Sequence, residues 1–380
     1  MRVLIIGAGI VGLTAGACLS RAGFEVIVCE RNERLRADGA GITLWPNALD
    51  IFETFGVGEP IVAAGYPVAN LRVLDPDGRE ASTYRGFGDI EERFGWPVIV
   101  IYRPTLSEIL AETLPAGALR FSARLVDLKQ TDNTVTAYFG DGSSESADVL
   151  IGADGIWSTV RRWVDANTEP EFNDQVMWRG VVHDATVTDS AITLAGDLRA
   201  SYIPLGGGRV YWLVGKFGLP AHQPHDQPIT EALALVEGWT HITPVIRRTD
   251  PGEALVTDIF RLTSLRTWHA GRVALAGDAA HAESPHVMIG ACLGVEDAFD
   301  LTRALSAERD PRGSIAAYSA ARSERLRWTQ SEAARIATLS SEEHGRALRE
   351  LQETLLATAP LQPGSMRPTT PDPRGSEDVS

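Results

Sequence analysis

Three glycines near the start of the chain have the spacing of a dinucleotide-binding turn. Gly7, Gly9 and Gly12 directly follow the apolar run 3–6 and lead into an apolar pattern of helical period. In such a turn the first glycine makes the tight bend, the second lets backbone approach a pyrophosphate, and the third allows close helix packing. Glu30 ends the next apolar run, where a carboxylate binds ribose hydroxyls. These residues predict a cofactor without a 2′-phosphate; the alternative is a glycine-rich turn with no ligand.

Asp278 is a second candidate for binding the sugar part of a cofactor. It follows Gly277 and the apolar run 273–276, and a loop then leads to a helical pattern that begins near Gly290. An aspartate at a strand end accepts hydrogen bonds from sugar or ribityl hydroxyls, and the first N–H groups of a helix attract an electron-rich group. The alternative is an ordinary strand–helix connection with a solvated aspartate.

Two more strand ends carry polar residues of the same kind. Asp154 and Gly155 follow a third apolar run, and Arg103 lies where a fourth run meets a helical pattern. The carboxyl ends of strands in an open α/β sheet border one crevice, so we expect the strand ends at Gly7, Asp154 and Asp278 to meet there. The alternative for Arg103 is a salt bridge at the surface.

A basic cluster that includes Arg31 and Arg36 follows Glu30. Such a cluster is most often a solvated turn. It could instead neutralise a pyrophosphate from a second side, so both arginines are candidates for cofactor binding.

The intervening segments have the pattern of antiparallel strands. Tight-turn sequences at 75–78, 141–142 and 206–208 each separate two strand-like runs. Residues 173–217 alternate aromatic and polar side chains, which predicts a sheet face with rings and guanidinium groups. Plain core and surface alternation would produce such a face, and so would a pocket for a planar, partly anionic ring. The residues are Trp178, Arg179, Arg199, Tyr202, Tyr211 and Trp212.

The composition is that of an ordinary globular protein. The chain has 380 residues, 44% hydrophobic and 22% charged, enough for a large core in one or two lobes. Its formal net charge of -15 argues against binding to nucleic acid or to an anionic membrane. Three distant cysteines show neither metal-ligand nor disulfide spacing, so no metal is predicted. Without a signal-peptide pattern or a long apolar run, a cytoplasmic enzyme is expected.

Taken in order, the motifs resemble those of class A flavin-dependent monooxygenases of the 4-hydroxybenzoate hydroxylase type. They are GAGIVG with Glu30, YRPTL with Arg103, LIGADGIWSTVR with Asp154, and ALAGDAAHAESP followed by GVEDA, with Asp278. The resemblance runs from residue 1 to about residue 328. The segment GITLWPNAL and the short C-terminus are similar to the branch with salicylate hydroxylase, urate hydroxylase and zeaxanthin epoxidase.

The resemblance implies an α/β fold. A Rossmann-type FAD-binding domain would be interleaved with a substrate domain on a mixed or antiparallel sheet, and a C-terminal helix would follow. The FAD-binding domain would comprise residues 1–70, 98–170 and 265–310, and the substrate domain residues 71–97 and 171–264. Residues 311–358 would form the helical segment and 359–380 a mobile tail.

The resemblance also implies roles for single residues. Thr43 would lie near the flavin ring, and the helix after Gly290 would stabilise negative charge on the reduced flavin. Asp154 belongs to a motif linked to both FAD and nicotinamide binding. Arg199 and Tyr211 match residues that face the substrate in urate hydroxylase-like members. The ADP, pyrophosphate and ribityl parts of FAD would be held by Gly7, Gly9, Gly12, Glu30, Arg31, Arg103 and Asp278.

The implied reaction is FAD-dependent monooxygenation. NAD(P)H would reduce FAD, O2 would then form a C4a-hydroperoxide, and the distal oxygen would hydroxylate a small aromatic or other electron-rich molecule. Epoxidation is a variant of the same chemistry. The chain has one GxGxxG turn, so NAD(P)H would bind transiently. A monomer or homodimer is expected.

The sequence departs from the family pattern after the proline loop. Family members commonly have Gly-Gln-Gly where this chain has Met288, Ile289 and Gly290. We expect the bulkier side chains to shift the flavin ring or alter its re-oxidation. The alternative function is therefore an FAD-binding protein of the same fold that acts as an oxidase, a redox-neutral catalyst or a ligand-binding module without oxygenation.

Overall fold

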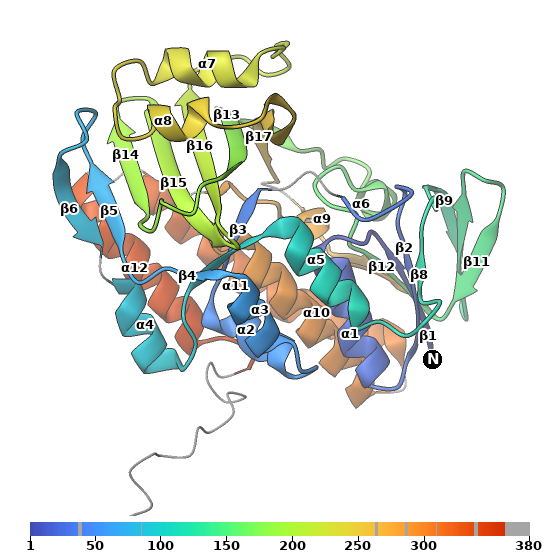
Figure 1. Cartoon of the computed structure of the whole chain (residues 1–380). Helices are drawn as coiled ribbons and strands as arrows, with labels where there is room; N and C mark the ends of the chain where they lie inside the picture. Colours follow the sequence, from blue (N-terminus) through green and yellow to red (C-terminus); the bar gives the residue numbers. More distant parts are fainter. Residues whose placement is uncertain are drawn as a thin grey trace, which may run out of the picture.

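The computed structural model shows an α/β protein in which two large sheets are joined by helices (Figure 1). It describes residues 1–36, 40–84, 86–262, 265–285, 288–308, 310–337 and 341–361. Most of the tail predicted from residue 359 onward lies outside the described residues. No helix in these ranges is long and apolar enough to cross a membrane.

The first sheet has six strands in the order β18-β19-β12-β1-β2-β8. All neighbours are parallel except β18 and β19. The central strands are apolar runs buried on both faces, as expected of a parallel sheet between helices. The strands are β1 (Arg2–Ile6), β2 (Glu25–Cys29), β8 (Leu119–Arg120), β12 (Val149–Gly152), β18 (His269–Ala270) and β19 (Val273–Leu275).

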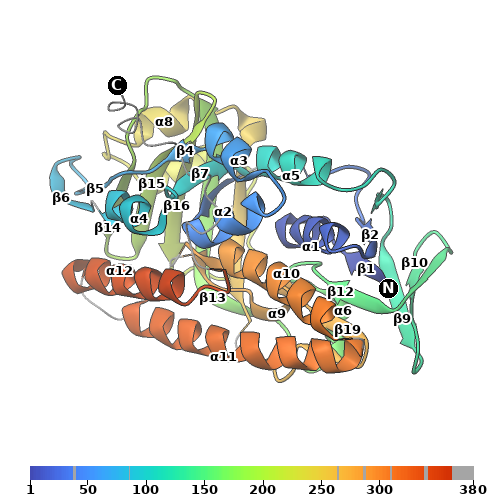
Figure 2. The same ribbon diagram turned by 90° about the horizontal axis from the view of Figure 1, so that it is seen from below.

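Helices cover this sheet, and three of them begin shortly after its strands β1, β12 and β19 end. In Figure 2, α10 lies between α1 and α11. The helix α5 begins with Arg103, as predicted, and has Pro104 in its first turn. The bounds are α1 (Ile10–Arg21), α5 (Arg103–Glu112), α6 (Thr159–Val164), α9 (Asp278–His281), α10 (Gly290–Ala307), α11 (Pro311–Ala337) and α12 (Ser341–Ala357).

The second sheet has seven strands in the order β17-β13-β16-β15-β14-β5-β6. Only the β14–β5 pair is parallel, so the predicted antiparallel pattern is confirmed. The turns at 75–78 and 206–208 join β5 to β6 and β15 to β16. The strands are β5 (Leu71–Leu74), β6 (Glu80–Tyr84), β13 (Glu171–His183), β14 (Ala191–Ala195), β15 (Leu198–Gly206), β16 (Arg209–Phe217) and β17 (Ala254–Arg261).

The two faces of this sheet pack against different parts of the molecule. Trp178 and Trp212 on the outer face share a core with the helices α7 (Pro228–Leu235) and α8 (Thr243–Arg247). Tyr211 on the inner face belongs to the core that contains the strands of the first sheet. The prediction of one face with all the rings and guanidinium groups is therefore wrong, because alternate residues of a strand point to opposite faces.

Two three-stranded sheets and short helices complete the fold. The sheet β3-β7-β4 lies between the two large sheets, and β11-β10-β9 contains the predicted turn at 141–142. The strands are β3 (Gly41–Leu44), β4 (Tyr66–Pro67), β7 (Ile99–Tyr102), β9 (Leu125–Gln130), β10 (Val135–Phe139) and β11 (Ser144–Ala147). The helices are α2 (Pro46–Glu53), α3 (Gly58–Ala64), α4 (Gly86–Phe94) and the 3-10 turn η1 (Pro251–Glu253).

Candidate functional site

The strand ends of the first sheet meet as predicted. The Gly7 amide donates to the Cys29 carbonyl at 2.8 Å, and the Ala153 amide donates to the Ile6 carbonyl at 2.8 Å. The Ala276 amide donates to the Gly152 carbonyl at 3.0 Å. The carboxyl ends of β1, β2, β12 and β19 therefore border one edge, which is where open α/β sheets bind ligands.

The three glycines of the first turn differ in what surrounds them. Gly7 has a positive φ of 104°, and a Cβ there would lie 2.4 Å from the Ala153 carbonyl oxygen. A Cβ on Gly12 would lie 1.9 Å from the Gly7 carbonyl oxygen, so helix and turn touch backbone to backbone. A Cβ on Gly9 would meet no atom within 4 Å. Gly9 therefore faces open space, which fits close approach by a ligand.

Glu30 lies against this turn. Its Oε2 accepts a hydrogen bond from the Ala8 amide at 3.0 Å, and its Oε1 accepts from the Asn32 amide at 3.0 Å and side chain at 2.6 Å. These bonds fix the carboxylate and leave lone pairs for ribose hydroxyls. The neighbouring Arg31 is exposed.

The turn also opens a helix that suits an anion. The helix α1 has no side-chain cap and no acidic residue in its first turn, although its first amides need acceptors. Free amides, open space at Gly9 and an ordered carboxylate at Glu30 together fit a dinucleotide with a free ribose. The residues present therefore fit the ADP half of FAD.

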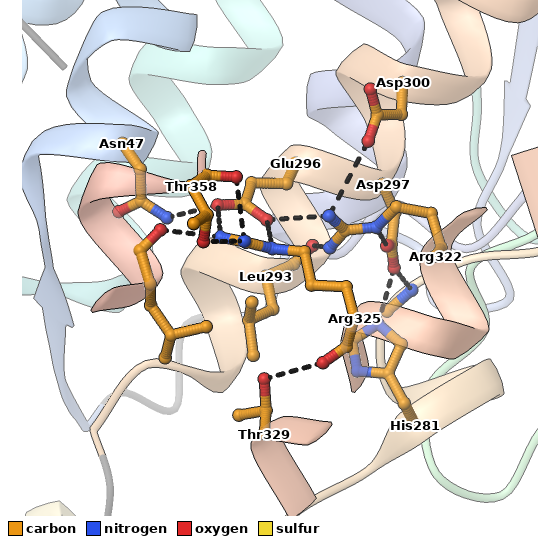
Figure 3. Close-up of polar contacts among 12 residues, drawn as sticks. Asn47, His281, Leu293, Glu296, Asp297, Asp300, Arg322, Arg325, Thr329 and Thr358 are labelled. Atoms are coloured by element: carbon orange, nitrogen blue, oxygen red, sulfur yellow. Dashed lines mark hydrogen bonds and ion pairs between the residues drawn. The ribbon is translucent and has the colours of Figure 1, made fainter. Parts of the chain in front are cut away.

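Asp278 is exposed at the start of α9, directly after the positive-φ residue Gly277. The Gly277 amide donates to Asp297 Oδ2 at 2.8 Å, and His281 Nε2 donates to the same oxygen at 2.5 Å. Arg322 Nε donates to Asp297 Oδ1 at 2.7 Å. The turn that presents Asp278 is thus anchored to α10 and α11 (Figure 3).

The anchor belongs to a larger buried network of charged groups. The Glu296 carboxylate accepts hydrogen bonds from Arg322 at 2.7 Å, from Arg325 at 3.0 Å and from the Asn47 side-chain amide at 2.8 Å. Arg322, Glu296 and Asp297 are at most 1% exposed. Burial opposes the charge of His281, but the Asp297 carboxylate outweighs it and raises the His281 pKa. Sequence reasoning missed this network, although two acids inside an apolar helical pattern are a signal of buried charge.

Asp154 accepts hydrogen bonds from the loop that follows it. Its carboxylate accepts hydrogen bonds from the Ser158 hydroxyl at 2.5 Å and from the Thr159 amide at 2.7 Å. Burial raises the pKa of Asp154. Arg161 then joins this loop to α9, because it donates to the Ile156 carbonyl at 2.6 Å and the Ala279 carbonyl at 3.3 Å. The side chain of Asp154 therefore holds the loop and the start of α6.

Thr43 and Gly290 lie on neighbouring elements. The Cys292 thiol contacts the Thr43 carbonyl at 3.8 Å, so β3 rests on the first turn of α10. Gly290 is the first residue of α10, which has no side-chain cap and no acidic residue in its first turn. A Cβ on Gly290 would meet no atom within 4 Å. Arg103 lies at the edge of the same region, where its amide donates to the Ala40 carbonyl at 3.1 Å.

The unusual pair before Gly290 has two different environments. Ile289 is fully buried in the main core. Met288 has a positive φ of 54°, and its carbonyl accepts a hydrogen bond from Trp45 Nε1 at 2.8 Å. The preceding residues 286 and 287 lie outside the described residues. The bulk of Ile289 is therefore accommodated in the core, whereas Met288 adopts a backbone conformation that costs a side-chain-bearing residue energy.

Arg199 and Tyr211 both lie on the inner face of the second sheet. Tyr211 packs on β3, where a Cβ on Gly41 would lie 3.0 Å from its ring. The Arg199 guanidinium lies 5.2 Å from the centre of the Phe217 ring. Burial lowers the pKa of Arg199. Within the described residues no carboxylate pairs with Arg199, so its charge is available to a ligand.

Comparison with known proteins agrees with this geometry. The family described as FAD binding domain matches residues 1–333. The aurachin C monooxygenase/isomerase of Stigmatella aurantiaca is 33% identical over 329 residues, covering 86% of each chain. The FAD-dependent urate hydroxylase of Klebsiella pneumoniae is 30% identical over 335 residues, covering 86% of this chain and 87% of that one.

A solved structure extends the similarity to three dimensions. The structure of Klebsiella pneumoniae HpxO with FAD and uric acid is 27% identical, with a TM-score of 0.83 and coverage of 93% of both chains. The expected fold and the expected family are both confirmed. The chain belongs to the FAD-binding-domain family and is an FAD-dependent enzyme of the class A flavin monooxygenases.

Proposed function

We propose that this protein hydroxylates a small aromatic or other electron-rich molecule, with NAD(P)H as electron donor and O2 as oxygen source. One oxygen atom enters the substrate and the other leaves as water, while NAD(P)H is oxidised to NAD(P)+ and one proton is consumed. The similarity to a urate hydroxylase and to the 3-hydroxybenzoate 6-hydroxylase of Klebsiella oxytoca supports an aromatic substrate.

The proposal rests on the position of the inner face of the second sheet, which lies next to β3 and the start of α10. Tyr211 packs against Gly41 of β3, and β3 rests on the first turn of α10 through Cys292. The same face carries Arg199, whose charge has no carboxylate partner in the described ranges. Polar side chains are thereby presented next to the strand and helix proposed to hold the flavin ring.

The assigned roles follow from this arrangement. Bound FAD would accept hydride from NAD(P)H and activate O2. The first amides of α10 would donate to the electron-rich pyrimidine side of the ring. Arg199 and Tyr211 would orient the substrate, and Thr43 would lie beside the ring. Asp154 would act through the loop that it holds. The remaining contacts to FAD are proposed for Gly7, Gly9, Gly12, Glu30, Arg31, Arg103 and Asp278.

The test is oxygen incorporation by the purified yellow protein. With labelled O2, NAD(P)H and a panel of phenols and hydroxylated heteroaromatic rings, we expect substrate-stimulated NAD(P)H oxidation and one labelled oxygen in the product. Glu30→Ala and Asp278→Ala should lose bound FAD, which the flavin absorbance measures. A yellow protein that transfers no oxygen to any member of the panel would contradict the proposal.

A second candidate function is supported by the backbone at Met288. Met288 has a positive φ of 54° and lies two residues before Gly290, the helix start at which the flavin ring is proposed to bind. A flavoprotein that oxidises or rearranges its substrate without inserting oxygen is therefore the alternative. In the same assay it would change the substrate without taking up label.

A further inference from the structure

The inner face of the second sheet carries a second arginine beside Arg199. In the sheet register Arg179 lies opposite Leu213, and Leu213 lies opposite Ser201. Arg199 lies two positions from Ser201, and Tyr211 two positions from Leu213. Side chains that lie opposite each other or two positions apart share a face. Arg179, Arg199 and Tyr211 are therefore arranged around Leu213 on one face.

Among the residues that the structure describes, the charge of Arg179 has no anionic partner. Its Nη2 donates to the Thr257 hydroxyl at 2.6 Å, and its Nε is buried without a partner. No carboxylate in the described part of the chain forms an ion pair with Arg179 or Arg199. The formal net charge of the chain is -15, so acids for pairing are abundant elsewhere. Two partly buried guanidinium groups on one face without acids are costly unless a ligand compensates them.

A third polar group, Gln175, lies four positions before Arg179 on β13. Gln175 is fully buried, and neither its amide oxygen nor its amide nitrogen has a partner. Its Nε2 would lie 2.9 Å from a Cβ on Gly215, the residue that lies opposite Arg199. Because Gly215 has no side chain, Gln175 and Arg199 lie on either side of a position that no side chain fills.

We propose that Arg179 is a specificity-determining residue which, together with Arg199, selects an aromatic substrate that carries a negative charge. The inference rests on the proposed hydroxylase function, because it concerns the same substrate site. The planar ring would lie over Leu213. Its carboxylate or ionised hydroxyl would accept hydrogen bonds from the two guanidinium groups, and Tyr211 would contact the opposite edge. A neutral ring would leave both cations uncompensated.

The test compares acids with their methyl esters on the FAD-loaded protein. Dissociation constants of 3-hydroxybenzoate, salicylate and anthranilate, and of the three methyl esters, are measured from the change in flavin absorbance without NAD(P)H. We expect the wild type to bind at least one acid more tightly than its ester. Arg179→Gln should weaken binding of that acid roughly 10- to 100-fold and leave the ester unchanged, because one charged hydrogen-bond donor is lost.

Three further variants separate recognition from folding. Arg179→Lys should restore part of the preference for the acid. Arg72→Gln removes an arginine of the same sheet that already pairs with Glu80 and Asp189, so the preference should not change. Thr257→Val removes the neutral partner of Arg179 and should keep the preference, because the charge remains.

Each outcome decides the inference. Equal weakening of acid and ester in Arg179→Gln would assign a purely structural role to Arg179 and overturn it. A wild type that prefers no acid over its ester would also overturn it. Binding is measured without turnover, so a protein that prefers the acids but inserts no oxygen would refute the hydroxylase function and leave the selectivity established.

Discussion

At the scale of single residues, one glycine of the first turn is needed for folding and another for the proposed binding of FAD. A Cβ on Gly12 would lie 1.9 Å from backbone, whereas a Cβ on Gly9 would meet nothing within 4 Å. Packing inside the protein therefore requires glycine at position 12. At position 9 the proposed ligand, and not the protein, requires it.

We therefore expect opposite results from alanine at these two positions. Gly12→Ala should lower the free energy of unfolding by about 1–3 kcal/mol, because backbone must move to admit the methyl group. Gly9→Ala should unfold like the wild type but bind FAD more weakly, since its methyl group occupies the ligand's space. Urea unfolding of the FAD-free proteins and FAD titration measure the two effects. Normal FAD affinity in Gly9→Ala would contradict the proposed placement of the pyrophosphate.

His281 predicts a dependence of stability on pH. Its pKa is raised in the folded protein from an ordinary value of 6.5, so protonated His281 stabilises the fold below that pH. This contribution is lost as the pH rises through the folded pKa. In His281→Gln, unfolding free energy above pH 6.5 should therefore fall less steeply with pH than in the wild type. His222→Gln is the control, because the His222 side chain is 75% exposed. Identical pH curves for His281→Gln and the wild type would argue against a protonated His281.

At the scale of elements, α10 and α11 are held together by buried charges, and through Asp297 they hold the Gly277 turn. The acids Glu296 and Asp297 share Arg322, which also donates to the Leu293 carbonyl at 2.9 Å. The helix pair thus supports the strand end that presents Asp278. Substitutions far from the crevice can therefore weaken the proposed cofactor site.

Arg322→Met should lower the free energy of unfolding by about 3–5 kcal/mol, because it removes the buried guanidinium group that two buried carboxylates share. The matched control is Arg303→Met, since Arg303 is 66% exposed and its partner Asp300 also lies 3.6 Å from Arg322. The control should change stability by less than about 0.5 kcal/mol. Chemical unfolding measures the free energy of unfolding of both variants. Equal losses in the two variants would contradict a special contribution of the buried network to stability.

The backbone conformation of Met288, in the loop before α10, predicts local strain. At Met288, with φ of 54°, glycine should be more stable than alanine by about 1 kcal/mol, although glycine is the more flexible residue when unfolded. Thermal or urea unfolding of Met288→Gly and Met288→Ala measures this difference. Comparing hydrogen peroxide release with product formation in Met288→Gly and wild type also tests whether this residue alters flavin re-oxidation. Greater stability of the alanine variant would rule out strain at this position.

At the scale of the whole molecule, the two sheets share one core. Val181, Leu205 and Tyr211 of the second sheet belong to the same buried cluster as the strands of the first sheet. Only the outer face of the second sheet forms a separate cluster with α7 and α8. The second sheet therefore packs directly on the part of the chain that is proposed to bind FAD.

FAD should accordingly stabilise both parts together. At a free FAD concentration 100 times the Kd, the expected gain is about 2.7 kcal/mol. Tryptophan fluorescence reports on both cores, because Trp45 and Trp96 lie in the first and Trp178 and Trp212 in the outer one. Flavin fluorescence reports on the crevice. Both probes should show the same upward shift in Tm. A second tryptophan transition that FAD does not move would show that the second sheet unfolds independently.

The sequence by itself determined the features that depend on local order. A glycine turn after an apolar run, an acid at the end of a strand and an arginine at the start of a helix are short-range patterns, and each appears where it was predicted. The parallel order of strands then brought Gly7, Asp154 and Asp278 to one edge, as the general rule for such sheets requires.

Only the tertiary structure decided which side chains face which neighbours. The register separated Arg179, Arg199 and Tyr211 from Trp178 and Trp212, although all five lie in one alternating stretch. Folding also joined His281, Asp297 and Arg322, which are far apart in the chain. Strand register and helix packing are set by long-range burial of apolar surface, and a local pattern does not contain that information.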